Sequence, residues 1–195
     1  SITAITSHTV QSISLDDNKT STSFINAGNF STGGNEMGPY SYALQSAGRI
    51  CNAANSSGND KFLISNSVLQ RKTDTPAGTY SICVESTDSI GGKVQGVFSI
   101  IINNPPSSEN LSLDHQTVSV TQTDVGTFSS DAGQEPLVFS LAITGEVCTA
   151  EKSAGNRYFS ITGNGLKRIS STATGEYSIC AQVTDAENQV TQKAF

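Results

Sequence analysis

The chain has 195 residues, of which 35% are hydrophobic and 14% charged, and its formal net charge is -6. This length allows one large domain or two domains of about 100 residues, and the acidity argues against a nucleic-acid partner, which needs a basic surface. No apolar run approaches the roughly 20 residues of a membrane-spanning helix. No secretory signal peptide is visible, so we interpret the chain as a mature or internal segment.

Apolar and polar residues alternate along several short segments, with the period of two that is typical of half-buried β-strands. In residues 80–86, for example, Tyr80 and Ile82 share one face and Cys83 lies on the other. The other predicted strands of the first half are residues 9–15, 40–44, 61–64, 68–72 and 93–102. Helical periodicity is weak throughout, so the sequence predicts an all-β fold.

The second half of the chain repeats the first at a spacing of 97 residues. Tyr80-Ser81-Ile82-Cys83 returns as Tyr177-Ser178-Ile179-Cys180, and Cys51 returns as Cys148. Further upstream the spacing becomes 98, because one residue has been gained or lost in the loop between positions 30 and 39. The repetition predicts two copies of one domain.

Each copy is expected to form a sandwich of about seven short strands, of the immunoglobulin-like type. We place the first domain at residues 9–104 and the second at residues 105–195. Pro105 and Pro106 follow Asn103-Asn104, and these paired prolines predict an extended and fairly stiff linker.

Both chain ends align inside one strand of the repeat. Residues 1–8 match the last strand of a repeat, since Ser1-Ile2 aligns with Ser99-Ile100, and the second domain stops at Phe195, where that strand begins. A missing strand leaves backbone groups unpaired and a core open. The chain is then either part of a longer tandem array, which we favour, or its residues 1–6 complete the second domain of a neighbouring copy by strand addition.

Each repeat contains two cysteines separated by 32 positions, Cys51 and Cys83 in the first and Cys148 and Cys180 in the second. Four cysteines allow three pairings, and the repeat favours one disulfide within each domain; buried free thiols are the alternative. No CxxC motif is present and the histidines do not recur with the cysteines, which argues against a metal site. Disulfides indicate an oxidising, extracellular compartment.

Strand parity places these disulfides outside the sandwich core. Cys83 lies on the face opposite Tyr80, so if the tyrosine faces the core, the bond holds the loop of residues 45–50 against the outer face of the strand. Closing a loop of this length stabilises a domain by about 3 to 4 kcal/mol in the chain-entropy model. That is a large share of a total stability of about 5 to 10 kcal/mol.

Several motifs give each repeat a resemblance to the cadherin-like domains of long extracellular proteins, including bacterial ones. In the second repeat they are Gly126-Thr127-Phe128, Asp131, Phe139-Ser140-Leu141, Phe159-Ser160-Ile161-Thr162-Gly163, Leu166, Tyr177-Ser178-Ile179 and Thr184-Asp185. The first repeat adds Phe98-Ser99-Ile100 and the Asn-Asn-Pro-Pro linker. The resemblance implies exported β-sandwiches strung end to end, which serve in adhesion or as spacers.

The resemblance also makes Asp88, Asp131 and Asp185 weak calcium candidates, because the family stiffens its domain joints with calcium. This ion needs six to eight oxygen ligands, mostly from carboxylates. Other acidic positions of the family are here occupied by Asn103, Asn104, Ser23, Thr121, Thr73, Thr75, Ser170 and Thr172. We therefore expect no cofactor, and expect the three aspartates to be solvated or to cap turns.

Four N-glycosylation sequons begin at Asn18, Asn29, Asn55 and Asn110, about as many as chance predicts when a quarter of the chain is Ser or Thr. No catalytic grouping recurs between the repeats. We expect a non-enzymatic extracellular segment of a longer stalk, surface adhesin or filament, with neighbouring repeats or copies of itself as partners. The alternative is a ligand- or carbohydrate-binding accessory module of a secreted enzyme, although the chain has no Trp for a sugar-binding platform.

Overall fold

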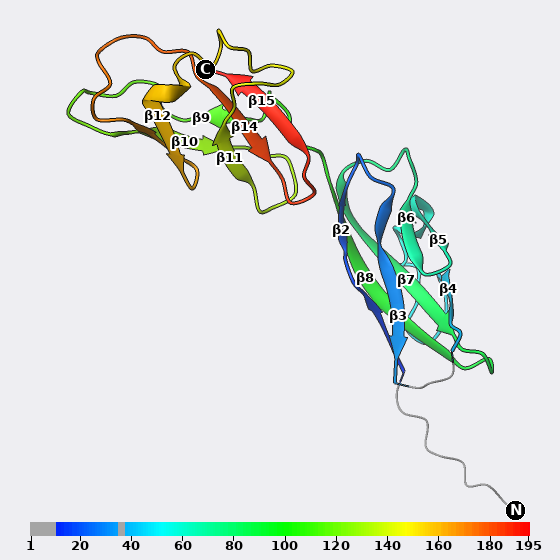
Figure 1. The fold of residues 1–195 in the computed structure, drawn as a ribbon. Helices are drawn as coiled ribbons and strands as arrows, with labels where there is room; N and C mark the ends of the chain where they lie inside the picture. Colours follow the sequence, from blue (N-terminus) through cyan, green and yellow to red (C-terminus); the bar gives the residue numbers. More distant parts are fainter. Residues whose placement is uncertain (1–10, 35–37) are drawn as a thin grey trace, which may run out of the picture. The chain divides into compact units, whose positions relative to one another are not determined.

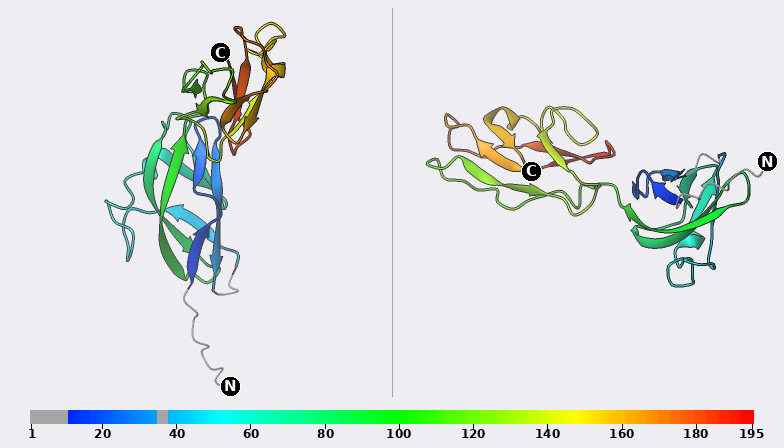
Figure 2. Two further views of the ribbon diagram at one scale, coloured as in Figure 1. Left: turned by 90° about the vertical axis from the view of Figure 1, so that its left-hand side faces the viewer. Right: turned by 90° about the horizontal axis from the view of Figure 1, so that it is seen from below.

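The computed structural model describes residues 11–34 and 38–195, which divide into two compact units. The first unit extends to Asn103, and the second runs from Asn104 to Phe195. Apart from one short 3-10 turn in each, the regular elements described in both units are β-strands (Figures 1 and 2). The predicted strand at residues 1–8 lies outside the described residues.

Two four-stranded sheets form the first unit (Figure 1). One sheet is antiparallel and has the order β1 (Ser12–Leu15), β3 (Asn26–Gly33), β6 (Val68–Arg71) and β5 (Phe62–Ser65). The other has the order β2 (Lys19–Ser21), β8 (Lys93–Asn103), β7 (Gly78–Thr87) and β4 (Ser41–Leu44). Strand β2 runs parallel to β8, whereas the remaining pairs of this sheet are antiparallel.

The core of the first unit lies between these sheets. Phe30, Phe62 and Leu69 come from one sheet, Ile82 and Ile100 from the other, and each is at most 4% exposed. Burying an apolar side chain of this size contributes about 1.5 to 3 kcal/mol. Side chains from both sheets therefore supply the contacts that hold the sandwich together.

The second unit repeats this arrangement. One sheet has the order β12 (Phe159–Thr162), β13 (Gly165–Arg168), β10 (Asp124–Ser129) and β9 (Ser112–Leu113), and the other has the order β11 (Val138–Leu141), β14 (Cys180–Thr184) and β15 (Val190–Ala194). Leu111, Phe128, Leu166 and Val183 are buried between them. The chain is thus all-β, and each unit is a β-sandwich.

The structure differs from the predicted strands in two ways. Strands β2 and β3 were not predicted, because their Lys, Thr, Ser, Asn and Gly residues show no apolar alternation; they form because neighbouring strands pair with them. The second difference is that residues 177–179 were predicted as strand, whereas β14 begins at Cys180. In the first unit the matching residues 80–82 pair with residues 98–100 of β8, whereas the pairing of β15 with β14 reaches only Ala194, opposite Cys180.

Candidate functional site

Both units hold a long loop against the outer face of a sheet by a disulfide bond. We call this segment the clamped loop: residues 45–61 in the first unit and 142–158 in the second. Cys51 is bonded to Cys83, and Cys148 to Cys180, each with a Cα–Cα distance of 5.5 Å. All four cysteines are at most 2% exposed, so the loop shields the bond from solvent.

Each disulfide lies outside the sandwich core. In β7, Cys83 stands between Ile82 and Val84, which both belong to the core cluster. Because side chains alternate along a strand, Cys83 points to the opposite face. Its complete burial there comes from the clamped loop, which gives each unit a second, smaller buried layer.

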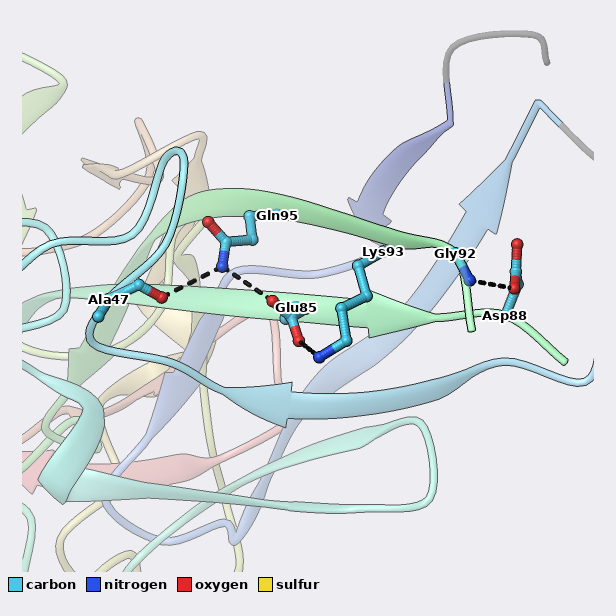
Figure 3. A network of polar contacts seen from close by, with 6 residues as sticks. All are labelled: Ala47, Glu85, Asp88, Gly92, Lys93 and Gln95. Atoms are coloured by element: carbon cyan, nitrogen blue, oxygen red, sulfur yellow. Dashed lines mark hydrogen bonds and ion pairs between the residues drawn. The ribbon is translucent and has the colours of Figure 1, made fainter. Parts of the chain in front are cut away.

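The side-chain amide of Gln95 in β8 fastens the first clamped loop (Figure 3). Its Oε1 accepts hydrogen bonds from the backbone N–H groups of Ile50 and Cys51, at 3.0 and 3.1 Å. Its Nε2 donates to the carbonyl oxygen of Ala47 at 3.3 Å and to Oε2 of Glu85 at 2.9 Å. One amide therefore joins residues 47–51 of the loop to β8 and, through Glu85, to β7. These four bonds use its two N–H donors and both lone pairs of its oxygen.

Gln192 in β15 builds the same arrangement in the second unit. Its Oε1 accepts from the N–H groups of Val147 and Cys148, at 3.3 and 3.1 Å. Its Nε2 donates to the carbonyl oxygen of Thr144 at 2.9 Å and to Oε1 of Gln182 at 3.0 Å. Gln182 stands where the first unit has a glutamate, so the network keeps its bonds although one charge is lost.

An asparagine at the 3-10 turn makes a second attachment. Asn59 begins η1 (Asn59–Lys61); its Oδ1 accepts from the N–H of Cys83 at 3.1 Å, and its Nδ2 donates to the carbonyl oxygen of Gln45 at 2.9 Å. Asn156 begins η2 (Asn156–Tyr158) and makes the matching bonds at 2.9 and 2.8 Å. The start and the end of each clamped loop are thus tied to the cysteine-bearing strand.

Glycine is required where the clamped loop passes the glutamine. Gly48 has φ +152° and Gly145 has φ +147°, a region that residues with a side chain rarely adopt. A Cβ at either position would overlap the amide of Gln95 or Gln192. These four residues recur at the 97-residue spacing, a regularity that sequence reasoning could have used to find them.

Glu85, which accepts a hydrogen bond from Gln95, also forms an ion pair. Its Oε1 accepts from Nζ of Lys93 at 2.7 Å (Figure 3), and this bond, together with the one from Gln95, holds the pKa of Glu85 below its usual range. The Lys93 side chain is 60% exposed, so water screens the ion pair and it contributes little to stability.

Two of the calcium candidates cap tight turns. Oδ1 of Asp88 accepts from the N–H of Ile90 at 3.0 Å. It also accepts from the N–H of Gly92 at 2.7 Å (Figure 3). Oδ1 of Asp185 accepts from the N–H groups of Glu187 and Gln189, at 3.0 and 2.8 Å. Backbone donors therefore point at the carboxylate oxygens that a cation would need to approach.

Asp131 is exposed. Across residues 11–34 and 38–195, the structure gathers no group of three or more His, Cys, Asp or Glu side chains that could hold a metal ion. Because calcium takes six to eight oxygen ligands, the described residues do not fit the ion that the cadherin-like resemblance suggests.

The sequon asparagines differ in their surroundings. Asn18 and Asn29 are exposed, and their Nδ2 atoms donate to Ser99 and Asp16. Asn55 is half-buried within the clamped loop, where its Nδ2 donates to the carbonyl oxygen of Ile50. Asn110 is also half-buried and accepts from a serine hydroxyl through Oδ1. Glycosylation therefore stays a prediction, and the two exposed sites are the better acceptors.

Sequence reasoning missed a buried arginine in each unit. Arg71 in β6 is 3% exposed and donates to backbone carbonyl oxygens, among them those of Thr22, Phe24 and Thr73. Arg168 in β13 is 8% exposed and does the same in the second unit. Their exact 97-residue spacing was visible in the sequence, but the carbonyl groups that they bind were not.

No family model matches the chain, and no curated protein is similar to it. Among solved structures, the human desmocollin-1 ectodomain is 13% identical with a TM-score of 0.34, over 91% of this chain and 34% of that one. Extracellular domains 3–5 of Drosophila OTK are 11% identical with a TM-score of 0.38, over 93% and 59%. A C-terminal fragment of intimin, solved with its receptor's intimin-binding domain, is 10% identical with a TM-score of 0.43, over 94% and 62%.

Protocadherin and immunoglobulin-domain ectodomains are also among the similar structures. The chain spans between a third and two thirds of the length of the three chains described above. At these TM-scores the similarities carry no correspondence between individual residues. Within the described part of the chain, no helix is long and apolar enough to cross a bilayer.

Proposed function

We propose that the chain is a non-enzymatic, extracellular, structural or adhesive segment of a longer stalk, surface adhesin or filament. The observation that carries this is the clamped loop, built twice with the same disulfide, the same glutamine and the same asparagine. A feature repeated in this way stabilises each unit separately, as expected in a tandem array whose domains each have their own core. Disulfides of this kind persist in oxidising compartments, which supports an extracellular location.

The mechanical role follows from where the disulfide sits. It joins the clamped loop to β7 or β14, which are central strands of their sheets. When a unit unfolds under tension, the 32-residue segment between its cysteines stays closed. About 110 Å of extended chain is therefore withheld from each unfolding step, at about 3.4 Å per residue.

Single-molecule stretching of the 195-residue chain between two handles tests this proposal. In oxidising buffer we expect two unfolding steps of similar length, one for each unit. After reduction each step should lengthen by about 110 Å, because the segment between the two cysteines is no longer held closed. Units that extend without a measurable force in oxidising buffer would refute a mechanical role.

A second experiment separates the segment from a binding module. The chain is titrated with a panel of soluble glycans while tyrosine fluorescence is recorded. We expect no saturable change, because the chain contains no Trp on which a sugar ring could stack. Saturable binding of one glycan at micromolar concentration would favour the accessory-module alternative instead.

A further inference from the structure

The tips of the two clamped loops differ in charge. We call residues 46–50 the tip of the first loop and residues 143–147 the tip of the second. All five residues of the first tip are exposed, and none of them belongs to a strand or helix. Arg49 lies in this tip, and at the 97-residue spacing its counterpart is Glu146. The charge at one position of an otherwise shared loop is therefore reversed between the units.

Arg49 and the glycine before it are not attached to the rest of the unit by polar contacts. Within residues 11–34 and 38–195, the Arg49 side chain makes no hydrogen bond or ion pair, and the backbone groups of Gly48 and Arg49 have no hydrogen-bonding partner. Ser46 and Ala47 are small as well, so no bulky side chain precedes Arg49 in the tip. Exposed loop tips with small or polar residues are preferred sites of proteolytic cleavage.

The other basic residues are less accessible to a protease than Arg49. Arg71 and Arg168 are buried, and the carbonyl oxygen of Lys72 accepts from Arg71 at 2.8 Å. Lys152 follows Thr149, whose Oγ1 and carbonyl oxygen accept from the N–H groups of Lys152 and Ser153. The remaining six lie in strands or 3-10 turns: Lys19, Lys61, Lys93, Arg157, Lys167 and Lys193. Arg49 is thus the best-presented of the 11 Lys and Arg residues.

We propose that the peptide bond between Arg49 and Ile50 is a cleavage site for a serine protease of the trypsin class. Such a protease has a carboxylate in its specificity pocket, which binds a basic side chain on the residue before the cleaved bond. Water is the second reactant: its oxygen makes the Arg49 carbonyl a carboxylate, and its protons leave Ile50 with an ammonium group. Glu146 offers no basic side chain, so the second unit is not cut at the matching bond.

The side chain of Gln95 controls how readily the tip is cut. A protease binds its substrate as an extended segment, so the residues on both sides of Arg49 have to leave the surface of the unit. Gln95 holds both sides, through the carbonyl oxygen of Ala47 at 3.3 Å (Figure 3) and the N–H of Ile50 at 3.0 Å. These hydrogen bonds have to open before cleavage, whereas the disulfide at Cys51 can stay closed.

A cut at this bond leaves the first unit assembled. Strands β1 to β4 precede the cut, and three of them pair with strands that follow it: β3 with β6, β2 with β8 and β4 with β7. Phe30 stays in the core. Cys51 and Cys83 both follow the cut, so their disulfide does not join the two pieces. Cleavage therefore replaces a covalent connection by contacts between strands.

The consequence of cleavage rests on the mechanical function proposed above, whereas the cleavage site does not. In a chain that bears tension, a cut first unit no longer unfolds as a tethered segment. Its two pieces separate, because no covalent bond carries the force across the unit. The protease thereby converts the first unit into a point of release, while the second unit stays intact.

Limited digestion of the 195-residue chain with trypsin, followed by mass spectrometry, tests the cleavage site. We expect the first products to be residues 1–49 and residues 50–195. Without reduction, the two fragments should elute together from a size-exclusion column in native buffer and separately in urea. The joint elution in native buffer checks that strand pairing holds the cut unit together.

Four variants test the residues that carry the proposal. Arg49→Gln should slow the first cut at least about a hundredfold, because the pocket of the protease loses its charged partner. Lys72→Gln is the matched control, since it removes another exposed basic residue of the first unit and should leave the rate unchanged. Gln95→Ala should speed the cut about tenfold, because the tip opens more easily. Glu146→Arg should add a second cut, on the amino side of Val147.

Three results would overturn the proposal. One is a first cut after any other basic residue, and another is equal slowing by Arg49→Gln and Lys72→Gln. The third is cleavage after Arg49 that rises with urea in step with unfolding of the unit, which would show that only the unfolded chain is cut.

Stretching the cut chain between two handles separates this proposal from the mechanical function. We expect the connection to part at the first unit, where the uncut chain gives an unfolding step. Resistance to trypsin together with two unfolding steps would overturn the cleavage site alone. Cleavage after Arg49 in a chain whose units bear no force would overturn the mechanical function alone.

Discussion

Arg71 and Arg168 bury a guanidinium group among backbone carbonyl groups. Arg168 joins the turn at Val120 and Gln122 to the segment at Ile169 and Ser170 with hydrogen bonds of 2.6 to 3.1 Å. The planar fork of five N–H donors suits several oxygens at once. The guanidinium group of each arginine thereby holds together separate backbone segments of its unit by donating hydrogen bonds to their carbonyl oxygens.

Arg168→Lys is expected to lower the free energy of unfolding of the second unit by about 3 kcal/mol. The ammonium group cannot reach all the carbonyl oxygens, and buried acceptors left without a donor cost about 1 to 3 kcal/mol each. Urea unfolding measures the change. Lys167→Gln is the matched control on the same strand: its ion pair with Asp124 is solvent-exposed, so we expect a change below about 1 kcal/mol. Equal effects of the two variants would contradict the role given to Arg168.

Asp16 and Asp114 occupy the same place in the two repeats. The backbone N–H of Asn29 donates to Oδ1 of Asp16 and that of Thr127 to Oδ1 of Asp114, both at 2.6 Å. These bonds are the largest cause that lowers the pKa of each carboxyl group; the Asn29 side chain adds to the effect at Asp16, and slight desolvation opposes it. Both aspartates therefore favour the folded state as carboxylates.

The sign of the pH dependence follows from these lowered pKa values. The stabilisation is complete above the ordinary aspartate pKa of about 3.9 and is lost as the pH falls through the lower folded-state pKa. We expect the free energy of unfolding to decline below about pH 5, and the double variant Asp16→Asn, Asp114→Asn to show a shallower decline. Urea unfolding at a series of pH values measures both slopes. The same slope in the variant and in the parent would refute this.

At the scale of the element, the clamped loop is a long segment with little regular structure that still packs over a buried disulfide. Its attachments come from side chains elsewhere in the chain, Gln95 and Asn59 in the first unit and Gln192 and Asn156 in the second. The disulfide sets where the loop crosses the strand, and these amides set its path on either side. We therefore expect that removing the disulfide also weakens the hydrogen bonds between these side-chain amides and the loop.

The double variant Cys148→Ala, Cys180→Ala is expected to lower the free energy of unfolding of the second unit by about 3 to 4 kcal/mol. The reason is that the unfolded chain regains the freedom of a 32-residue loop. Calorimetry should show the second unit unfolding at a lower temperature. Cys51→Ala, Cys83→Ala is the matched control, which should shift only the transition of the first unit. One transition that moves in both variants would show that the units are not independent.

Strands were predicted correctly where apolar and polar residues alternate along the sequence. They were missed where a segment without such alternation becomes a strand by pairing with its neighbours. Residues 80–86 and 93–102 alternate strongly, and the structure forms β7 and β8 there. Strand β3 carries Gly28 at φ +152°, where a Cβ would overlap the carbonyl oxygen of Asp17. Asn and Gly have low β-propensity, so the sequence of β3 does not indicate a strand. The strand forms because it pairs with β1 and β6 on either side.

At the scale of the whole molecule, each unit has its own core, disulfide and buried arginine. The cadherin-like resemblance suggests calcium at domain joints, yet Asp88 and Asp185 are occupied by backbone donors. We expect calcium or a chelator to leave the unfolding temperatures of both units unchanged, because an ion stabilises only a state that binds it. Scanning calorimetry with calcium, with magnesium and with a chelator measures this. A rise with calcium alone would reveal a site beyond the described ligands.

The amino-acid sequence by itself determined the all-β class, the repeat, the choice of cysteine partners and the outward parity of Cys83. These properties depend on periodicity and spacing, which are written along the chain. Only the tertiary structure decided that the disulfide is buried and that Arg71 and Arg168 bind carbonyl oxygens. Those properties depend on backbone groups of residues far apart in the sequence, for example the 44 positions between Gln95 and Cys51. Because nearly every residue carries the same backbone groups, the sequence does not indicate which of them will form these hydrogen bonds.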